Sequence, residues 1–348
     1  RVEIGRQIKI NSRTGHPHIV APAQARAQSS RTGVDEFLPL GIALRYHSPT
    51  RNRRTAMPLN RQCQTIVDAL AAASSAPPDK PDHLAARAAY AKTTAFYQHA
   101  TDELASVEDR SFPGPGGEVP IRVYRPYSEG DSAPCLLFFH GGGWSLGDLD
   151  SHDHMCRHFA HGAQATVIAV DYRLAPEHKF PAAVDDSVAA VRWVFENARQ
   201  LDIDAKRIAV GGDSAGGNLA AAASIALRDT NGPPLTLQLL IYPAVNFTAD
   251  NESLRDNGSG YILTRDALEI FADLYLPNSE ARSDPRASPQ LRNNHANLPG
   301  AFVQTAEFDP LRDEGRTYAE TLMAAGCAVE YKCYPGVVHG FARMGGRV

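Results

Sequence analysis

Gly212-Asp213-Ser214-Ala215-Gly216 decides how the rest of this 348-residue sequence is interpreted, because it matches the pattern Gly-x-Ser-x-Gly. A chain of this length shows the pattern by chance roughly one time in seven, so the motif alone is weak. The apolar run 208–210 precedes it as a strand would, and an alanine-rich helical stretch begins at Asn218. A serine in a sharp strand-to-helix turn, with glycine two residues away on either side, is typical of a nucleophile elbow. An incidental serine in a glycine-rich turn is the alternative.

Strand-like and helical stretches alternate around this turn. The strand-like runs cover residues 118–124, 135–139, 165–170, 207–210, 235–242, 301–305 and 328–334. Helical spacing covers residues 182–198, 218–228 and 311–325. This alternation predicts βαβ units and an α/β fold with a mostly parallel sheet. Catalytic groups in such folds lie on loops at the carboxyl ends of the strands.

Two regions fall outside the alternation. Alanine-rich helical stretches at 59–73 and 82–100 precede the first strand-like run, and the insertion 246–288 carries one helical stretch, 266–275. An insertion of that length is more than a connection between two strands. We therefore expect one α/β domain over residues 57–348, with a helical cap formed by about 57–105 and 246–288.

Residues 1–56 differ from the rest of the chain in charge. They hold ten Lys or Arg against three Asp or Glu, whereas the whole chain has a formal net charge of −4. They show no helical or strand period, so we expect a disordered basic leader, or upstream sequence translated ahead of a start at Met57. An Arg-rich transit segment is the alternative. No run is long enough to cross a bilayer, and the overall charge favours neither nucleic-acid binding nor stable membrane insertion.

The cysteines and histidines give no clear framework of disulfides or metal ligands. Five cysteines without a Cys-x-x-Cys pair fit reduced thiols in a cytoplasmic protein. One cluster could suggest a metal site, since some of its members share a helix face. Its members are His152, His154, Cys156, His158 and His161. We expect instead a solvent-facing helix there, with no metal and no cofactor.

A run of three glycines follows the strand-like stretch 135–139, in His140-Gly141-Gly142-Gly143-Trp144. Backbone amides that no side chain obstructs can approach a substrate oxygen and stabilise an oxyanion. The predicted oxyanion-hole donors are the amides of Gly142, Gly143 and Ala215, the last following the nucleophile. A phosphate-binding loop is the competing interpretation, but neither Gly-Lys-Ser/Thr nor Gly-x-Gly-x-x-Gly is present. His140 is expected to order the loop.

A serine nucleophile needs a base, and the base needs an orienting carboxylate. In folds of this kind the chain order is serine, then acid, then histidine. His295 and His339 are the two histidines after Ser214, and His339 is favoured because it follows the strand-like stretch 328–334. The acid candidates follow the stretch 301–305 in the sequence. They are Asp309, which we favour, with Asp313 and Glu307 as alternatives.

Five motifs together resemble the hormone-sensitive-lipase-like family of microbial carboxylesterases over most of residues 57–344. They are His140-Gly-Gly-Gly-Trp144, Asp171-Tyr-Arg-Leu-Ala-Pro-Glu-His178, Gly212-Asp-Ser-Ala-Gly-Gly217, Asp309-Pro-Leu-Arg-Asp-Glu314 and His339-Gly-Phe341. The resemblance implies an eight-stranded α/β-hydrolase sheet with a helical cap, and a triad of Ser214, Asp309 and His339. It also implies a possible homodimer through the last strand. Relatives continue with a final helix, whereas this sequence ends nine residues after His339, so we expect modest stability.

The expected function is the hydrolysis of short-chain acyl esters by a Ser-His-Asp triad, through an acyl-enzyme and with a small-molecule ester as the substrate. Trp144 and Phe341 are expected to line the substrate site, although core packing explains them almost as well. An amidase or peptidase with the same triad is one alternative. A ligand receptor without turnover is another, which the intact His339 disfavours.

Overall fold

The computed structural model describes residues 58–73, 82–97, 101–127, 132–346 and 348. The expected basic leader, residues 1–56, lies outside the described residues. Within them the strands form one eight-stranded sheet in the order β1-β2-β4-β3-β5-β6-β7-β8. The strands are β1 (Ser106–Gly114), β2 (Gly117–Arg125), β3 (Ala133–Phe139), β4 (Thr166–Val170), β5 (Ile203–Asp213), β6 (Leu237–Ile241), β7 (Gly300–Phe308) and β8 (Val329–Val338).

The sheet is parallel except at β2, which runs antiparallel to both of its neighbours, β1 and β4. All other neighbouring pairs are parallel. This confirms the predicted α/β-hydrolase architecture. The pattern of apolar runs did not reveal β1, because seven of its nine residues are polar, glycine or proline and only Phe112 is buried.

The strand register brings the ends of several strands to one edge of the sheet. Phe139 at the end of β3 pairs with Gly212 of β5, and Asp213 pairs with Ile241 at the end of β6. At the far side, Phe308 of β7 pairs with Val338 of β8. The segments that follow β3, β5, β7 and β8 therefore leave the sheet at the same edge, where parallel α/β folds place their sites.

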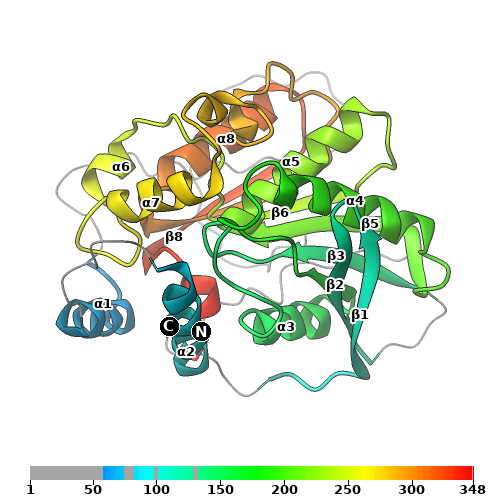
Figure 1. Ribbon diagram of the computed structural model, residues 1–348, viewed down its shortest axis with the longest axis horizontal. Coiled ribbons are helices and arrows are strands. Elements are labelled where there is room, and N and C mark those ends of the chain that lie inside the picture. The colour runs from blue at the N-terminus through cyan, green and yellow to red at the C-terminus, as the bar shows by residue number, and fades with distance from the viewer. Residues whose placement is uncertain (1–57, 74–81, 98–100, 128–131, 347) are drawn as a thin grey trace, which may run out of the picture.

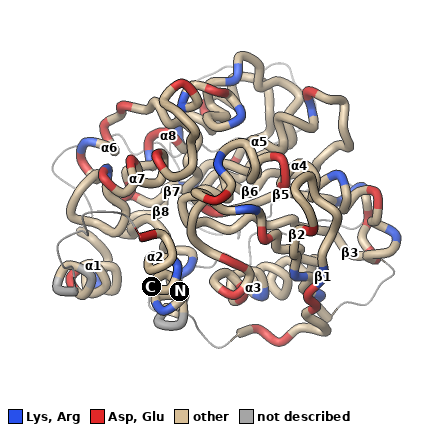
Figure 2. The backbone as a smooth tube through the Cα atoms, in the orientation of Figure 1, with Lys and Arg blue, Asp and Glu red and all other residues tan. Residues whose placement is uncertain are grey.

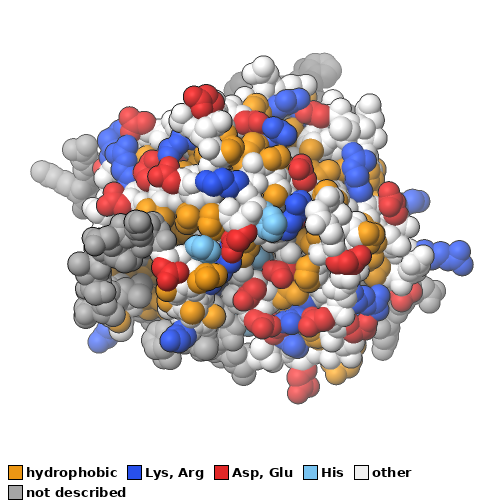
Figure 3. Space-filling view, in the orientation of Figure 1, with side chains coloured by type: hydrophobic (Ala, Val, Ile, Leu, Met, Phe, Trp, Pro, Cys, Tyr) orange, Lys and Arg blue, Asp and Glu red, His pale blue; other side chains and the backbone are white. Residues whose placement is uncertain are grey.

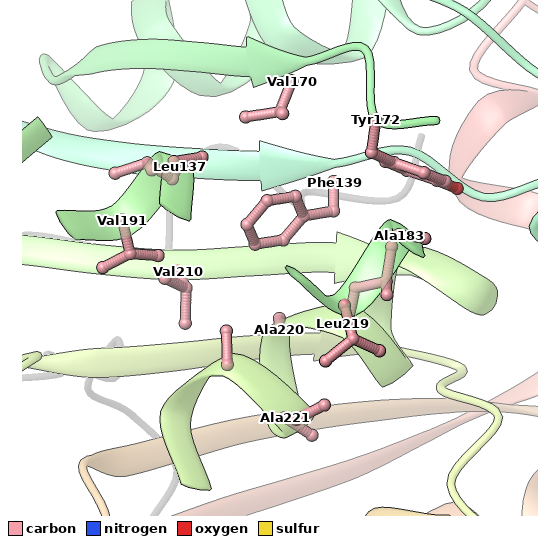
Figure 4. Close-up of a cluster of buried hydrophobic side chains, with 14 of the residues drawn as sticks. Leu137, Phe139, Val170, Tyr172, Ala183, Val191, Val210, Leu219, Ala220 and Ala221 are labelled. Atoms are coloured by element: carbon pink, nitrogen blue, oxygen red, sulfur yellow. The ribbon is translucent and has the colours of Figure 1, made fainter. Parts of the chain in front are cut away.

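Helices cover both faces of the sheet (Figure 1). Helices α4 (Ala182–Glu196), α5 (Ala215–Asp229) and α8 (Arg312–Ala324) contribute to one apolar cluster. Helices α1 (Arg61–Ala73) and α3 (Asp153–Ala163) contribute to a second cluster, on the other face. Strand residues alternate between the two clusters, as the pleat requires. Figure 4 shows Leu137, Phe139 and Val210 of the sheet beside Val191 of α4 and Leu219 of α5.

Most of the remaining helices come from the two regions outside the βα alternation. They are α2 (His83–Tyr97), α6 (Glu252–Asp256) and α7 (Arg265–Tyr275), with the short 3-10 helix η1 (Glu280–Ser283). The 3-10 helices η2 (Pro289–Leu291) and η3 (Phe341–Arg343) lie further along the chain. Thr264 caps α7 by accepting a hydrogen bond from the Ala267 amide at 3.1 Å. In Figure 1, α1, α2, α6 and α7 all lie in the left half of the view.

Figure 2 shows basic and acidic residues interspersed along the chain. The five cysteines form no disulfide. Among the described helices, none combines the length and the apolar character needed to cross a bilayer.

Candidate active site

Ser214 sits in a strained turn between β5 and α5. Its φ is 55° and its ψ is −116°, in a region that non-glycine residues rarely adopt. Its amide donates to the Ile241 carbonyl at 2.8 Å, and its own carbonyl accepts from the Asn218 amide at 3.1 Å. Helix α5 begins at Ala215, three residues earlier than the sequence pattern suggested, so its N-terminus lies directly beside the serine. This geometry is that of the predicted nucleophile elbow.

The glycines that flank Ser214 are required by space rather than by backbone conformation. A Cβ on Gly216 would overlap the carbonyl group of Phe139 at the end of β3. A Cβ on Gly212 would overlap the backbone of Gly216 itself. The small residues therefore let α5 start in contact with the end of β3, where the glycine loop begins.

His339 lies within hydrogen-bond distance of both Ser214 and Asp309. The Nε2 atom of His339 is 3.0 Å from Ser214 Oγ, and Nδ1 is 2.7 Å from Asp309 Oδ2. Because a carboxylate only accepts, Nδ1 carries the proton and Nε2 presents its lone pair to the serine hydroxyl. Asp309 is fully buried, and its other oxygen accepts from the Leu311 amide at 2.8 Å. The Tyr242 ring packs against the imidazole, with ring centroids 4.6 Å apart.

The alternative acids and base are engaged elsewhere. Asp313 accepts from the Ser253 amide at 2.8 Å and pairs with Arg312 at 2.9 Å. Glu307 accepts from the Gly336 amide at 2.8 Å. His295 is buried with its Nε2 atom 3.0 Å from the Pro289 carbonyl. The structure thus brings Asp309 and His339 to Ser214.

The three-glycine segment forms a tight loop against the elbow. Gly142 and Gly143 have φ values of 124° and 59°, which favour glycine. Gly142 O accepts from the Leu146 amide at 2.9 Å, and no hydrogen bond within the described part of the chain uses the amides of Gly142 or Gly143. The amide of Ala215, as the first residue of α5, has no intrahelical acceptor. All three predicted oxyanion donors are therefore available to a ligand.

His140 orders this loop, as its position suggested. Its ring stacks on Tyr172 with centroids 4.4 Å apart, and the Tyr172 hydroxyl donates to the His140 carbonyl at 2.7 Å. Nδ1 lies 2.9 Å from the Gly141 carbonyl. Burial lowers the pKa of His140 to about 4, so the ring is neutral near pH 7.

The two residues expected to line the substrate site are packed in the interior. Trp144 is 3% exposed and stacks on Tyr275 with centroids 4.6 Å apart. Phe341 is 2% exposed and packs against Tyr242 at 5.4 Å. Their contacts are those of core residues, and substrate contact by either ring stays a prediction.

Helix α3 is only partly the solvent-facing helix that the sequence suggested, because one side of it packs on the sheet. His152, which precedes it, is 1% exposed, and Cys156 is fully buried. His154 Nε2 lies 3.1 Å from the Arg343 carbonyl, and exposed His158 lies 3.0 Å from Asp102. Among the described residues, no group of three or more His, Cys, Asp or Glu is arranged to hold a metal ion.

Sequence reasoning missed two side chains that contact the glycine loop. Phe271 of α7 lies directly over the glycine loop, since a Cβ on Gly143 would overlap its ring. Asp213 accepts from the Gly141 amide at 2.8 Å. The position of Asp213 inside the serine motif was a signal for the second contact, whereas nothing local pointed to Phe271. Figure 3 shows apolar and histidine side chains reaching the surface between α7 and α2.

Fold and site together define the class of protein, a serine hydrolase built on an α/β sheet. Comparison with known proteins identifies the family within this class. A family model described as alpha/beta hydrolase fold matches residues 136–343. Carboxylesterase NlhH of Mycobacterium tuberculosis is 48% identical over 230 residues, which cover 65% of this chain and 72% of that protein.

Two further relatives agree. Ethyl acetate hydrolase of Pseudomonas putida is 41% identical over 266 residues, covering 75% of this chain and 83% of that protein. The solved structure of a hyperthermophilic esterase from Pyrobaculum calidifontis matches with a TM-score of 0.80 at 42% identity, covering 83% of this chain and 92% of that one. The chain belongs to the α/β-hydrolase family, in its hormone-sensitive-lipase-like carboxylesterase group, and is a serine ester hydrolase.

Proposed function

We propose that this enzyme hydrolyses short-chain carboxylic esters, with Ser214 as nucleophile, His339 as base and Asp309 as the orienting acid. The observation that carries the proposal is the chain of contacts from Ser214 Oγ to His339 Nε2, 3.0 Å, and from Nδ1 to Asp309, 2.7 Å. Support for a short acyl chain comes from the relative named ethyl acetate hydrolase.

In the first half of the reaction, Ser214 Oγ attacks the ester carbonyl carbon while its proton moves to His339 Nε2. The buried Asp309 carboxylate stabilises the imidazolium that forms. The amides of Gly142, Gly143 and Ala215 donate to the oxyanion, and such preorganised donors are each worth a few kcal/mol. His339 then returns the proton to the leaving alkoxide, and the alcohol departs.

The second half repeats the same steps with water. Water attacks the acyl-serine carbonyl as His339 Nε2 takes a proton, and the same three amides stabilise the second oxyanion. Collapse releases the carboxylic acid and returns the proton to Ser214 Oγ. Every proton in this cycle moves between Ser214, His339, water and the leaving group, so the steps draw on no cofactor.

The acyl chain has a candidate pocket beside the elbow. A cavity of about 60 Å³ has apolar side chains along part of its wall: Ala244, Phe247, Leu254, Leu268, Ala272 and Leu311. The polar part of the wall carries Asn246, Arg265, Glu269, Arg282 and Glu314. Ala244 donates its amide to the Ser214 carbonyl at 3.3 Å, and Leu311 donates to Asp309 at 2.8 Å, so the cavity adjoins the triad. An apolar cavity of about 150 Å³ holds a benzene ring, and a smaller one suits a chain of few carbons.

The helices outside the βα alternation are proposed to form the cap. Phe271 of α7 covers Gly143, and Arg87 of α2 donates to the Ser145 and Ala175 carbonyls at 2.8 and 3.0 Å. Thr94 of α2 accepts from Arg343 at 2.7 Å. Both regions therefore contact the segments that carry the site, as a lid over a substrate would.

A series of p-nitrophenyl esters from acetate to dodecanoate tests the proposal, with Ser214→Ala as the matched control. We expect turnover that is highest for the short chains and absent in the variant. Folded wild-type protein that turns over no ester faster than Ser214→Ala would refute the proposed function. Faster cleavage of matched anilides than of esters would point to an amidase.

A further inference from the structure

The Asp213 carboxylate lies between the nucleophile elbow and the glycine loop, and the triad does not use it. Asp213 is 1% exposed, and its Oδ1 atom accepts the Gly141 amide at 2.8 Å. A Cβ on Gly141 would overlap this carboxylate, so the loop backbone lies directly on it. Gly141 is the residue before the two predicted oxyanion donors. The carboxylate therefore fixes the peptide plane from which the donors Gly142 and Gly143 extend.

Other side chains hold the Asp213 carboxylate in this place. His152, also 1% exposed, puts its Nε2 atom 3.2 Å from Asp213 Oδ1, a close electrostatic contact without hydrogen-bond geometry. The other nitrogen of His152 lies 2.9 Å from Ser151 Oγ. On the opposite side the Tyr242 hydroxyl donates to Asp213 Oδ2 at 3.4 Å. The carboxylate thus has contacts on both oxygens, and one of them comes from a histidine 61 positions earlier in the chain.

The negative charge of the Asp213 carboxylate is unfavourable for the reaction, unless the residue also stabilises the site in another way. A buried negative charge beside the elbow opposes the oxyanion that forms there. Burial would raise the pKa of Asp213, but the His152 and Arg343 side chains and the Gly141 amide lower it to about 2. Asp213 is therefore ionised near pH 7, and hydrogen bonds to an ionised acceptor are roughly twice as strong as neutral ones.

We propose that Asp213 and His152 are positioning residues for the oxyanion hole: Asp213 anchors the glycine loop through the Gly141 amide, and His152 holds the Asp213 carboxylate in the anchoring position. The inference rests on the proposed function, because it concerns the oxyanion of that reaction. It assigns one of the histidines outside the triad to the same site. An anchor of this kind acts on the transition state, so its loss lowers kcat and leaves KM nearly unchanged.

The test compares truncating and conservative variants of both residues. Asp213→Ala and His152→Ala remove the anchor, whereas Asp213→Asn keeps an acceptor oxygen and His152→Gln keeps a donor near the Nε2 position. The matched control is His158→Gln, because His158 is exposed on α3 and pairs with Asp102. Each variant is assayed for kcat and KM on p-nitrophenyl butyrate. Its active sites are titrated with a phosphonate, and its inhibition constant is measured for a trifluoromethyl ketone, which forms a tetrahedral oxyanion on the serine.

We expect both alanine variants to lose about 10- to 100-fold in kcat per titrated site, less than the 10²–10³ of deleting one oxyanion donor. KM should change less than threefold, and the inhibition constant of the ketone should rise by the factor that kcat/KM loses. Asp213→Asn and His152→Gln should recover at least tenfold over the corresponding alanine variants. His158→Gln should match the wild type.

Other outcomes overturn the proposal. If the titre of active sites falls while kcat per titrated site stays at the wild-type value, the pair supports folding and not the oxyanion hole. If an alanine variant does not fold, Asp213→Asn and His152→Gln decide: a rise in KM at unchanged kcat contradicts an oxyanion role. The ester turnover of the wild type and of Ser214→Ala is compared first. If the wild type is no faster than this variant, the proposed function itself is refuted.

Discussion

Replacing Gly216 with alanine tests whether contact between α5 and the end of β3 sets the geometry of the site. The added Cβ would lie more than 1 Å inside the 3.0 Å that real Cβ atoms keep from other heavy atoms. The obstructing group is the backbone carbonyl of Phe139, so no side chain can rotate away. Either α5 or the segment leading to the glycine loop must therefore move by about 1 Å, and a misplacement of that size can cost about 10²-fold in rate.

We expect Gly216→Ala to lower kcat/KM on p-nitrophenyl butyrate by about 10²-fold. Overpacking of this kind also costs about 1–3 kcal/mol of stability, which thermal unfolding followed by circular dichroism would show. The matched control is Gly300→Ala at the start of β7, where the nearest atom to an added Cβ is 3.3 Å away. Its activity should stay within about twofold of the wild type. A folded Gly216→Ala enzyme with a full active-site titre and kcat/KM within threefold of the wild type would refute the reasoning.

Three further predictions concern buried side chains around the site. Asp309→Asn should lower kcat by about 10⁴-fold, because the amide does not hold the imidazole in the same tautomer. Asp313→Asn, which alters a carboxylate bonded to the Ser253 amide, should lower the melting temperature and keep kcat within threefold; equal losses of kcat would contradict the assignment of the acid. Burial raises the pKa of Glu314 from its ordinary 4.5 to about 8, against the opposing effect of the Val245 and Asn246 amides. The stability this group contributes is therefore full below pH 4.5 and is lost as pH rises through about 8. Urea unfolding at pH 5 and pH 8.5 should show a smaller loss for Glu314→Gln than for the wild type, and an equal loss would exclude Glu314 as the cause. Trp144→Ala should cost about 3–5 kcal/mol of stability through the lost Tyr275 stack. An unchanged KM would indicate that Trp144 acts in core packing alone, whereas a KM raised more than threefold would support its predicted contact with the substrate.

The contacts among Ser214, His339 and Asp309 could be predicted because their signals are local or depend on chain order. Ser214 lies between a short apolar run and an alanine-rich helix, and that setting is visible within ten residues. Chain order left two histidines as candidates for the base. His339 was preferred over His295 because it follows a predicted strand. The sequence identified the acid less clearly than the base, since the candidates Asp309 and Asp313 lie only four residues apart. Only the fold shows that Asp313 faces Ser253 instead.

The features that could not be predicted depend on residues distant in the sequence. His152 stands in a polar stretch, and no periodicity distinguishes a histidine buried against Asp213 from one exposed on a helix. Phe271 belongs to an amphipathic helix, whose sequence shows an apolar side without showing what that side covers. Within the described residues, β1 is an edge strand that pairs with β2, and it has no apolar run because only Phe112 among its side chains is buried. In each case the missing information is the identity of the tertiary neighbour.

The contacts of Gly141, Asp213 and Gly216 explain how the proposed nucleophile is fitted to the glycine loop that carries two of the predicted oxyanion donors. The residue before Ser214 bonds the glycine loop, and the glycine two residues after it makes room for the strand end from which that loop begins. The elbow and the loop are therefore fitted to each other through backbone and one carboxylate, with few rotatable side chains between them. Such an arrangement restricts changes in the distance between Ser214 and the predicted oxyanion donors. The ring of Phe271, from helix α7, lies over Gly143 of that loop.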